Sequence, residues 1–360
     1  MHQIETNFSI DESGLHTAAV FRTVSTRDAD ELARNLSGWQ QSYDQISAGR
    51  FQGTLDELCL PRLQVFRETI NQAVRQSCRV MPGALWFGFP EHLEPAEGNR
   101  INGRKVEPEL IMLHAGNSEF ELLTGSGHAI HGVVVGQQWL MAQVQDDCQI
   151  DWQGLQSWEV LRAAPLARAA CVNTIKALLA CPDQHDRVDL QQTLAENLLA
   201  LLGHGGVLPA AAGSFQRRQR IVASVRDHVL SHLDQAITVP QMCEQAHVSR
   251  RTLQYCFEDI VGMSPTQYLR RVRLNGVRRQ LRYPQSGKEA IGAVASDWGF
   301  DNFSQFSSDY RKLFGACASQ SMAAGPGSIG NRQRAPAWNA GAKLNRGVMQ
   351  LQIHTPSAPD

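Results

Sequence analysis

The 360-residue chain contains no apolar run of about 18 residues, the length that a membrane-spanning helix requires. Its first thirty residues also lack the apolar core of a secretory signal peptide, and they carry acids that include Asp11, Glu12, Asp28 and Asp30. Both absences favour a cytoplasmic protein that has no membrane partner.

The cysteines lack any spacing that is typical of a metal site. Eight of them are scattered along the chain, with no C-x-x-C pair and no Cys/His cluster of zinc-finger type. The segment HAIH holds His128 and His131, but a separation of three residues on a strand puts two side chains on opposite faces. We therefore expect reduced, buried thiols and no metal site.

The common enzyme signatures are missing as well. There is no G-x-S-x-G elbow, no phosphate-binding P-loop and no G-x-G-x-x-G that follows a predicted strand. A DNA-repair alkyl transferase would need a reactive cysteine, but Cys181 in ACPDQ has no base near it in the sequence. We therefore expect that the chain is not an enzyme.

Charge is distributed unevenly, although the formal net charge is only −1. Residues 217–318 hold 15 Lys and Arg against 9 Asp and Glu, whereas residues 1–216 hold 15 against 25. Within 217–282 there are 12 arginines, no lysine and 5 acids. Opposite charge balances indicate two domains with different partners, and a polyanion is the natural partner of the basic one.

Hydrophobic periodicity predicts an α+β protein of several domains. The segment DADELARNLSGWQQSYDQI (28–46) has a helical apolar stripe, and between 51 and 136 five short segments have the pattern of strands: GTLDELCL, RLQVFRETI, ALWFGFP, EFELL and HAIHGVVV. Short strands at this spacing predict a small, cupin-like β-barrel. Two helical patterns follow, one over 158–180 that is broken or kinked at Pro165 and one over 187–203.

The predicted organisation has six parts. They are a loosely ordered N-terminus (1–25), a β-rich effector-binding domain (26–150), a helical pair that packs on it or forms a homodimer seam (151–203), a linker (204–216), an all-helical DNA-binding domain (217–318) and a disordered tail (319–360).

The basic half contains two helix-turn-helix patterns. In the first, VPQMCEQA and the turn HVS precede a helix that Ser249 caps, with Leu253 and Phe257 facing inward. In the second, AIGAVASD and a turn at Gly299 precede a helix with Phe306 and Tyr310 on its inner face. The segment MSPTQYLRRVRLNGVRRQLR (263–282) predicts a long basic helix between them, so two reading helices could enter successive major grooves of double-stranded DNA.

These motifs resemble the AraC-type transcription regulators, whose signature is G-F-x5-F-x3-[FY]-x4-G-x-x-P. Gly299, Phe300, Phe306, Tyr310 and Gly315 match it, and Ala318 stands where the proline is expected. VSRRTLQ, GMSPTQYL and RLNGVRRQL match the first half of the family's domain, with Gly276 inside the joining helix at a cost of roughly 1 kcal/mol against alanine. The resemblance covers about 100 residues.

Residue chemistry and the resemblance together supply candidate DNA contacts. Arginine reads guanine and glutamine reads adenine, whereas other arginines bind phosphates without reading sequence. The resemblance implies base contacts from Arg251, Gln254, Tyr255, Phe303, Ser304, Gln305 and Ser308. The candidate phosphate contacts are Arg250, Arg270, Arg271, Arg278 and Arg279.

The N-terminal half resembles one branch of this family, the regulators of ethanolamine-utilisation operons. WQQSYDQISAGRFQGTLDEL, LQVFRE, RQSC, LWFGFP and SEFEL carry the similarity. It implies an activator that works with RNA polymerase and responds to ethanolamine together with adenosylcobalamin, although no D-x-H-x-x-G corrinoid box is present. The alternatives are a regulator of another amine or small-molecule pathway, and a first domain that only dimerises.

An amine pocket would need carboxylates and aromatic faces. Strand-like segments supply both kinds of residue, and the candidates are Glu68, Trp86, Phe87, Phe89, Glu119 and Glu121. The alternative is that the aromatic rings fill the core while the glutamates face water.

Overall fold

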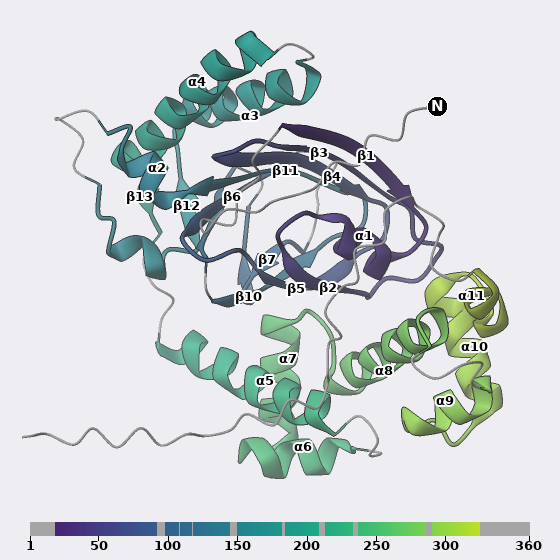
Figure 1. Ribbon diagram of the computed structural model, residues 1–360. Coiled ribbons are helices and arrows are strands. Elements are labelled where there is room, and N and C mark those ends of the chain that lie inside the picture. The colour runs from purple at the N-terminus through teal and green to yellow at the C-terminus, as the bar shows by residue number, and fades with distance from the viewer. Residues whose placement is uncertain are drawn as a thin grey trace, which may run out of the picture. The chain divides into compact units, whose positions relative to one another are not determined.

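The computed structural model describes residues 19–91, 98–107, 109–116, 118–144, 150–181, 184–208, 213–232, 237–284 and 290–324. The chain divides into two compact units, 1–327 and 328–360, and all of the described residues lie in the first unit. This unit combines a sheet-rich domain with a helical domain (Figure 1).

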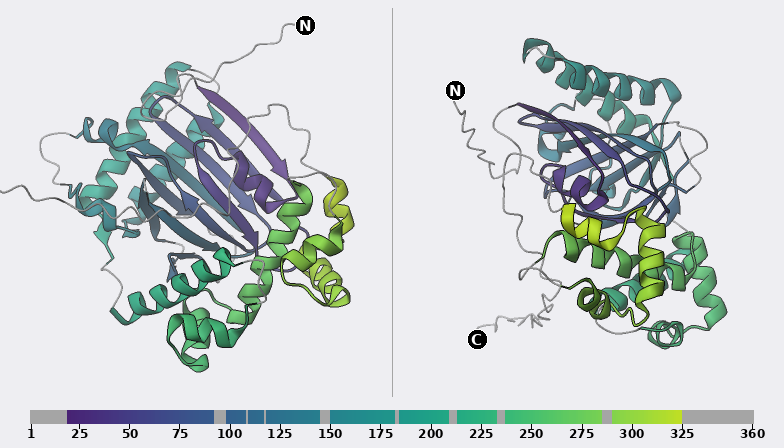
Figure 2. Two further views of the ribbon diagram at one scale, coloured as in Figure 1. Left: turned by 60° about the horizontal axis from the view of Figure 1, so that its bottom comes forward. Right: turned by 90° about the vertical axis from the view of Figure 1, so that its right-hand side faces the viewer.

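The larger sheet has eight strands, and each pairing in it is antiparallel. In spatial order they are β1 (Val20–Thr26), β3 (Gly53–Cys59), β4 (Leu63–Ile70), β11 (His128–Gly136), β6 (Ala84–Pro90), β9 (Ile111–Ala115), β12 (Val160–Arg162) and β13 (Gly206–Val207). Figure 2 shows these strands side by side.

The smaller sheet has five strands: β2 (Gln40–Gln45), β5 (Val74–Arg79), β10 (Glu119–Thr124), β7 (Arg100–Ile101) and β8 (Arg104–Lys105). The five strands predicted between 51 and 136 are confirmed as β3, β4, β6, β10 and β11. The predicted closed barrel is wrong, because the hydrogen-bonded ladders of the described residues form two separate open sheets.

Side-chain alternation along the strands builds two cores in this domain. On β6, Trp86 packs into the core between the two sheets, whereas Leu85 and Phe87 pack into a core against helices. Those helices are α3 (Pro165–Ala180) and α4 (Gln184–His204), which lie on the other face of the large sheet (Figure 1). The domain is therefore layered as helices, large sheet and small sheet.

The chain between 20 and 46 differs from its prediction. Residues 1–25 are predicted to be loosely ordered, but residues 20–25 of that stretch belong to β1, which pairs with β3 along its whole length. The helix predicted over 28–46 is only α1 (Ala29–Asn35), and β2 follows it. Gly38, at φ 72°, turns the chain between them, so Tyr43 is buried from a strand and not from a helix.

Two further boundaries differ for simple reasons. Pro165 occupies the first turn of α3, where its missing N–H costs nothing, so it starts the helix and does not kink it. The predicted linker contains β13, which pairs with β12, and the first residues of α5 (Gly213–Ser231). A short helix α2 (Gln137–Met141) and a 3₁₀ turn η1 (Gly154–Ser157) complete the sheet domain.

The C-terminal domain is all-helical, as predicted, and its described part has two cores. After α5 come α6 (Val239–Ala246), α7 (Arg250–Ile260), α8 (Pro265–Arg282), α9 (Ile291–Asp297), α10 (Phe303–Phe314) and α11 (Ala318–Ala324). Leu253, Phe257 and Tyr268 belong to the first core, and Phe306 and Tyr310 to the second. The prediction of a disordered tail is wrong for residues 319–324, which belong to α11, and the rest of the predicted tail lies outside the described residues.

The structure explains the glycine inside the joining helix. A Cβ at Gly276 would collide with the ring of Trp298, whose indole N–H donates to the Gln280 side chain (2.8 Å). Gly276 therefore lowers the helix propensity of α8 but allows α8 to pack closely against the end of α9. No helix in the described part of the chain is long and apolar enough to cross a membrane.

Candidate nucleic-acid interface and ligand cavity

The first helix pair, α6 and α7, turns sharply at His247, whose φ is 50°. Ser249 begins α7 by accepting the backbone N–H of Thr252 (3.1 Å), and Leu253 and Phe257 anchor its inner face. The opposite face of α7 is open to solvent at Arg250, Arg251 and Tyr255, while Gln254 is half-buried.

The second helix pair, α9 and α10, repeats this arrangement. Gly299, at φ 74°, makes the turn, and Asn302 begins α10 by accepting the backbone N–H of Gln305 (2.9 Å). Phe300, Phe306 and Tyr310 pack ring against ring with centroids 5.1 and 5.6 Å apart. The exposed residues of α10 include four of the predicted base contacts: Phe303, Ser304, Gln305 and Ser308.

Both candidate glutamines are held by carboxylates of their own helices. The amide of Gln254 donates to Glu258, and that of Gln305 donates to Asp309 (3.1 Å). Each bond links residues four apart, so it orients the amide along the helix surface. The second N–H and the carbonyl oxygen of each amide remain available to a base edge.

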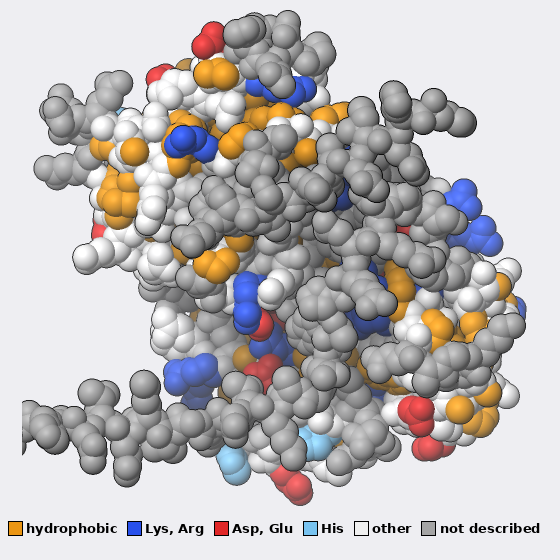
Figure 3. All heavy atoms as spheres, viewed as in Figure 1, with side chains coloured by type: hydrophobic (Ala, Val, Ile, Leu, Met, Phe, Trp, Pro, Cys, Tyr) orange, Lys and Arg blue, Asp and Glu red, His pale blue; other side chains and the backbone are white. Residues whose placement is uncertain are grey.

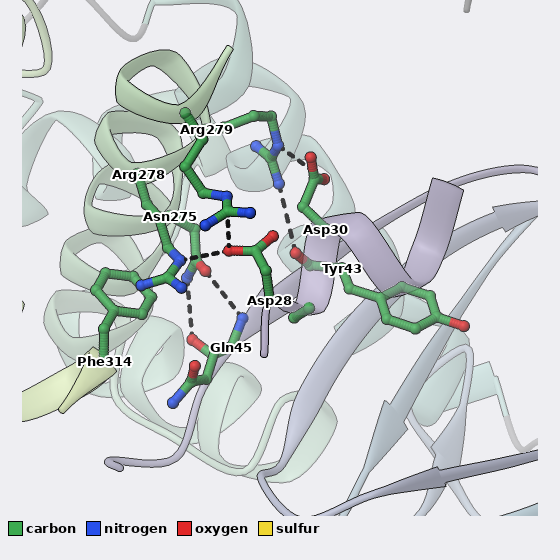
Figure 4. Close-up of a pocket in the computed structure, with 10 residues that line it drawn as sticks. Asp28, Asp30, Tyr43, Gln45, Asn275, Arg278, Arg279 and Phe314 are labelled. Atoms are coloured by element: carbon green, nitrogen blue, oxygen red, sulfur yellow. Dashed lines mark hydrogen bonds and ion pairs between the residues drawn. The ribbon is translucent and has the colours of Figure 1, made fainter. Parts of the chain in front are cut away.

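The predicted phosphate contacts separate into two groups. Arg250 and Arg270 are exposed and Arg271 is half-buried, with Arg270 ion-paired to Asp309. Arg278 and Arg279 instead face the sheet domain, so the prediction that they contact phosphate does not fit this arrangement (Figure 4). Sequence reasoning took their charge as a sign of solvent exposure, whereas carboxylates distant in the chain partner them.

These carboxylates come from α1, β2 and the loop before α1. Arg278 Nε lies 2.7 Å from Asp28 Oδ2, while Arg279 lies 3.0 Å from both Asp30 and Asp44. Burial by itself would raise the pKa of Asp28, but Arg278 and Arg282 hold that pKa below its usual value. The Asn275 amide exchanges two 2.9 Å hydrogen bonds with the backbone of Gln45.

A second set of ion pairs joins the small sheet to α5. Arg75 lies 2.6 Å from Glu121, and Arg226 of α5 lies 3.1 Å from the same carboxylate. Burial by itself would raise the pKa of Glu121, but the two guanidinium groups hold it lower. The outward face of the small sheet therefore docks the helical domain.

A cavity lies between the two sheets. The space in it that the centre of a water molecule can occupy is about 20 Å³. Its wall includes Trp39, Tyr43, Phe66, Glu68, Trp86 and His128. The Tyr43 hydroxyl donates to Glu68 (2.9 Å), and the Trp39 ring meets Trp86 edge-on at 5.7 Å.

Burial changes the ionisation of the polar groups in this cavity. It raises the pKa of Glu68 to about 7 and lowers the pKa of His128 to about 4, which leaves the imidazole neutral at pH 7. Trp86 Nε1 and both His128 nitrogens are buried without a hydrogen-bond partner among the described residues. The cavity therefore has unused hydrogen-bonding capacity.

The predicted effector residues do not all lie in this cavity. Glu68 and Trp86 line it, but Phe87 and Phe89 face α3 and α4, because neighbours on a strand point to opposite sides. Glu119 is exposed and paired with Arg79, and Glu121 belongs to the interface with α5. These four assignments to an effector pocket are therefore wrong for this cavity.

Sequence reasoning missed Tyr43 and His128. Tyr43 was assigned to a helix, so its position facing Glu68 could not be inferred. The predicted separation of the two histidines is confirmed: His128 lines the cavity, whereas His131 lies 3.1 Å from Glu91. The described part of the chain gathers no cluster of three potential metal ligands.

Comparison with known proteins points to one family. A family model described as a helix-turn-helix domain matches residues 242–323. A probable thc operon regulatory protein of Rhodococcus erythropolis is 26% identical over 189 residues, which is 52% of this chain and 49% of that protein. XylDLEGF operon transcriptional activator 2 of Pseudomonas putida is 32% identical over 104 residues, 29% of this chain and 64% of that protein.

Among solved structures, the AraC-like transcriptional activator CuxR aligns with 76% of this chain and all of its own, at 15% identity and a TM-score of 0.37. The chain spans about half the length of the Rhodococcus relative, and less than two thirds of the Pseudomonas one. These named relatives are operon regulators, not enzymes. The chain is therefore similar to operon regulators over at most about half of its length, and residues 242–323 match a helix-turn-helix domain.

Proposed function

We propose that this protein is a sequence-specific DNA-binding activator of a catabolic operon, controlled by a small effector that binds its first domain. The observation that carries the proposal is the pair of capped helices, α7 and α10, each with a buried aromatic side and an exposed polar side. This is the arrangement of a helix that reads base edges in the major groove.

In this proposal each helix reads DNA in its own way. Arg251, Gln254 and Tyr255 are the base contacts of the first unit, and arginine and glutamine are strong base readers. The second unit presents Phe303, Ser304, Gln305 and Ser308, which contribute less hydrogen-bond readout and more shape recognition. Arg250, Arg270 and Arg271 are the proposed phosphate contacts, while Arg278 and Arg279 dock the domains.

Selection from a random DNA library with the full chain would define the operator. Arg251→Ala and Gln254→Ala should then relax sequence preference, by roughly 1–3 kcal/mol for each lost base pair contact. Arg271→Ala should weaken binding to all DNA alike and flatten the salt dependence by about one phosphate contact. Equal losses on operator and random DNA for Gln254→Ala would remove it from the base-reading set.

The cavity between the sheets supports an effector site in the first domain. Glu68 and Trp86 supply a carboxyl group and an aromatic face, the combination an amine requires. Resemblance to ethanolamine-operon regulators makes ethanolamine the first candidate. A corrinoid does not fit here, because adenosylcobalamin is far larger than a cavity in which water centres can occupy only about 20 Å³. Thermal melting of the full chain with ethanolamine, alkylamines, amino acids and sugars tests the site, and no shift with any of them would favour a first domain that only dimerises.

A homodimer is the second proposed property, and exposed apolar residues favour it. Leu166 of α3 is 85% exposed and Val188 of α4 is 63% exposed, and Figure 3 shows hydrophobic side chains on the surface over these helices. Water contact with such side chains is lost when two copies associate. Sedimentation of the full chain and of Leu166→Glu tests this, and a monomer at all concentrations would exclude it.

A further inference from the structure

The buried carboxyl groups of the described residues differ in whether an arginine lies within ion-pair distance. Five of them are less than 10% exposed in the described residues, and four lie within ion-pair distance of an arginine: Asp28, Asp30, Asp44 and Glu57. The fifth, Glu68, has no basic partner in the described part of the chain, and its hydrogen bond comes from the Tyr43 hydroxyl (2.9 Å). A buried carboxylate without a positive partner is costly, so Glu68 must carry a proton or meet a cation.

The surroundings of Glu68 suit an organic cation. Trp39 meets Phe66 and Trp86 edge-on, with ring centroids 6.0 and 5.7 Å apart, and all three line the same cavity. Aromatic faces attract ammonium groups through their quadrupoles, most strongly where water is excluded. Trp86 Nε1 and the His128 nitrogens, buried and unpartnered, can bind a polar substituent on such a ligand.

We propose that this cavity binds a small organic ammonium ion, whose charge rests beside the Glu68 carboxylate in place of the carboxyl proton. The inference rests on the proposed effector role of the first domain, and it specifies the chemistry of the ligand. The space open to the centre of a water molecule is only about 20 Å³, which favours a primary ammonium on a short chain over a bulky quaternary one.

Among the titratable groups around the cavity, Glu68 is the group whose charge changes near pH 7. Burial raises the pKa of Tyr43 and of Cys78 above their usual values and lowers that of His128 to about 4. The two strands that flank Glu68 place Leu55 and Ile130 opposite it. Since burial raises the Glu68 pKa to about 7, ion binding below pH 7 must release this proton to solvent.

Calorimetry of the full chain tests whether an ammonium ion replaces the Glu68 proton. Methylammonium and ethylammonium chloride are the probes, and methanol and ethanol are their neutral counterparts. The ammonium ions should bind saturably and the alcohols should not. Affinity should fall about tenfold for each pH unit below 7, and buffers of different ionisation enthalpy should report about one proton released at pH 6 and almost none at pH 8.5.

Two variants make the test specific. Glu68→Gln should abolish binding of the ions, whereas Glu119→Gln, which neutralises an exposed carboxylate, should leave it unchanged. If Glu68→Gln fails to fold, Tyr43→Phe keeps the carboxylate and removes a hydrogen bond that lowers its pKa, so the pH at which affinity begins to fall should move upward.

Three outcomes would overturn the inference: binding of the alcohols in preference to the ions, binding that Glu68→Gln or the pH leaves unchanged, and no heat with any probe at millimolar concentration. Operator binding by the same preparation is measured in parallel. If the preparation binds the operator but not the ammonium ions, only this inference is rejected. If it does not bind DNA, the proposed function is rejected.

Discussion

The contact between the sheet domain and α8 and the cavity between the two sheets bury carboxyl groups to the same depth. Asp28 in the contact is 2% exposed and Glu68 in the cavity is 3% exposed. Arg278 and Arg282 hold the pKa of Asp28 below its usual value, whereas burial raises that of Glu68 to about 7. Burial sets the cost of the charge in both regions, but the partner decides whether the group keeps its charge.

The largest loss of stability is expected for Asp28→Asn. The amide still caps α1 but leaves the buried Arg278 without its anion, while Arg282 keeps Glu31 at 3.0 Å, so the free energy of unfolding should fall by about 3 kcal/mol. The lowered pKa of Asp28 means that this stabilisation is present above the unfolded pKa, near 3.8, and is lost as pH falls further.

Urea unfolding of the full chain at pH 7 and pH 3 measures both effects. Asp227→Asn, which changes an exposed carboxylate beside Arg226, is the matched control. A loss below about 1 kcal/mol for Asp28→Asn at pH 7 would show that solvent, not the carboxylate, satisfies Arg278.

Glu68→Gln should have an effect of similar size and opposite sign. In the wild type the unfolded carboxyl ionises from about pH 4.5 while the folded one keeps its proton to about 7, so stability falls across that window and then levels off. This difference in pKa lowers the free energy of unfolding above pH 7 by on the order of 3 kcal/mol, and the glutamine variant should not show this decrease. Unfolding free energies at pH 5 and pH 8 check this, and parallel pH profiles of the two proteins would contradict it.

Asp44→Asn should cost about 1 kcal/mol, because both of its arginines keep another carboxylate. Arg75 stays 2.6 Å from Glu121, and Arg279 stays 3.0 Å from Asp30. Chemical denaturation at pH 7 compares it directly with Asp28→Asn. An equal loss in the two variants would mean that the whole ion network acts as one cooperative unit.

The smallest effect is expected for Glu119→Gln. Its side chain is 59% exposed and its partner Arg79 is 45% exposed, so water and salt screen the pair. The change in unfolding free energy should remain within about 0.5 kcal/mol, and added salt should reduce it further. A change above 1 kcal/mol would contradict the distinction between exposed and buried pairs that the larger predictions use.

Local patterns in the sequence predicted much of the fold. Alternation along 128–136 correctly separated the faces of His128 and His131, and the four-residue spacing of Phe306 and Tyr310 correctly placed both in a helical core. The same reasoning failed at 28–46, where leucines at helical spacing predict one helix but residues 40–45 form strand β2. A glycine at positive φ ended the helical stretch there, and pairing with β5 decided the rest.

The candidate site was predicted only in part, for a physical reason. Residues that present side chains to solvent from one helix, such as Arg251 and Gln305, follow from caps and periodicity alone. Arg278 and Arg279 follow from no local rule, because their partners lie more than 230 positions earlier in the chain. The sequence indicated Glu68 as an effector contact by its charge and its aromatic neighbours, but it could not show that Glu68 has no basic partner in the described part of the chain.

The sequence by itself determined the two-domain plan, the strands between 51 and 136 and the helix pairs with polar outer faces, because capping, turns and periodicity are local properties of the chain. The tertiary structure alone decided which charged groups are paired. Whether a carboxyl group meets a guanidinium, as Asp28 does, or a tyrosine hydroxyl, as Glu68 does, depends on strands and helices brought together from distant positions. Because both groups are buried, the first neighbour gives an ion pair and the second gives a carboxyl group whose pKa is raised to about 7.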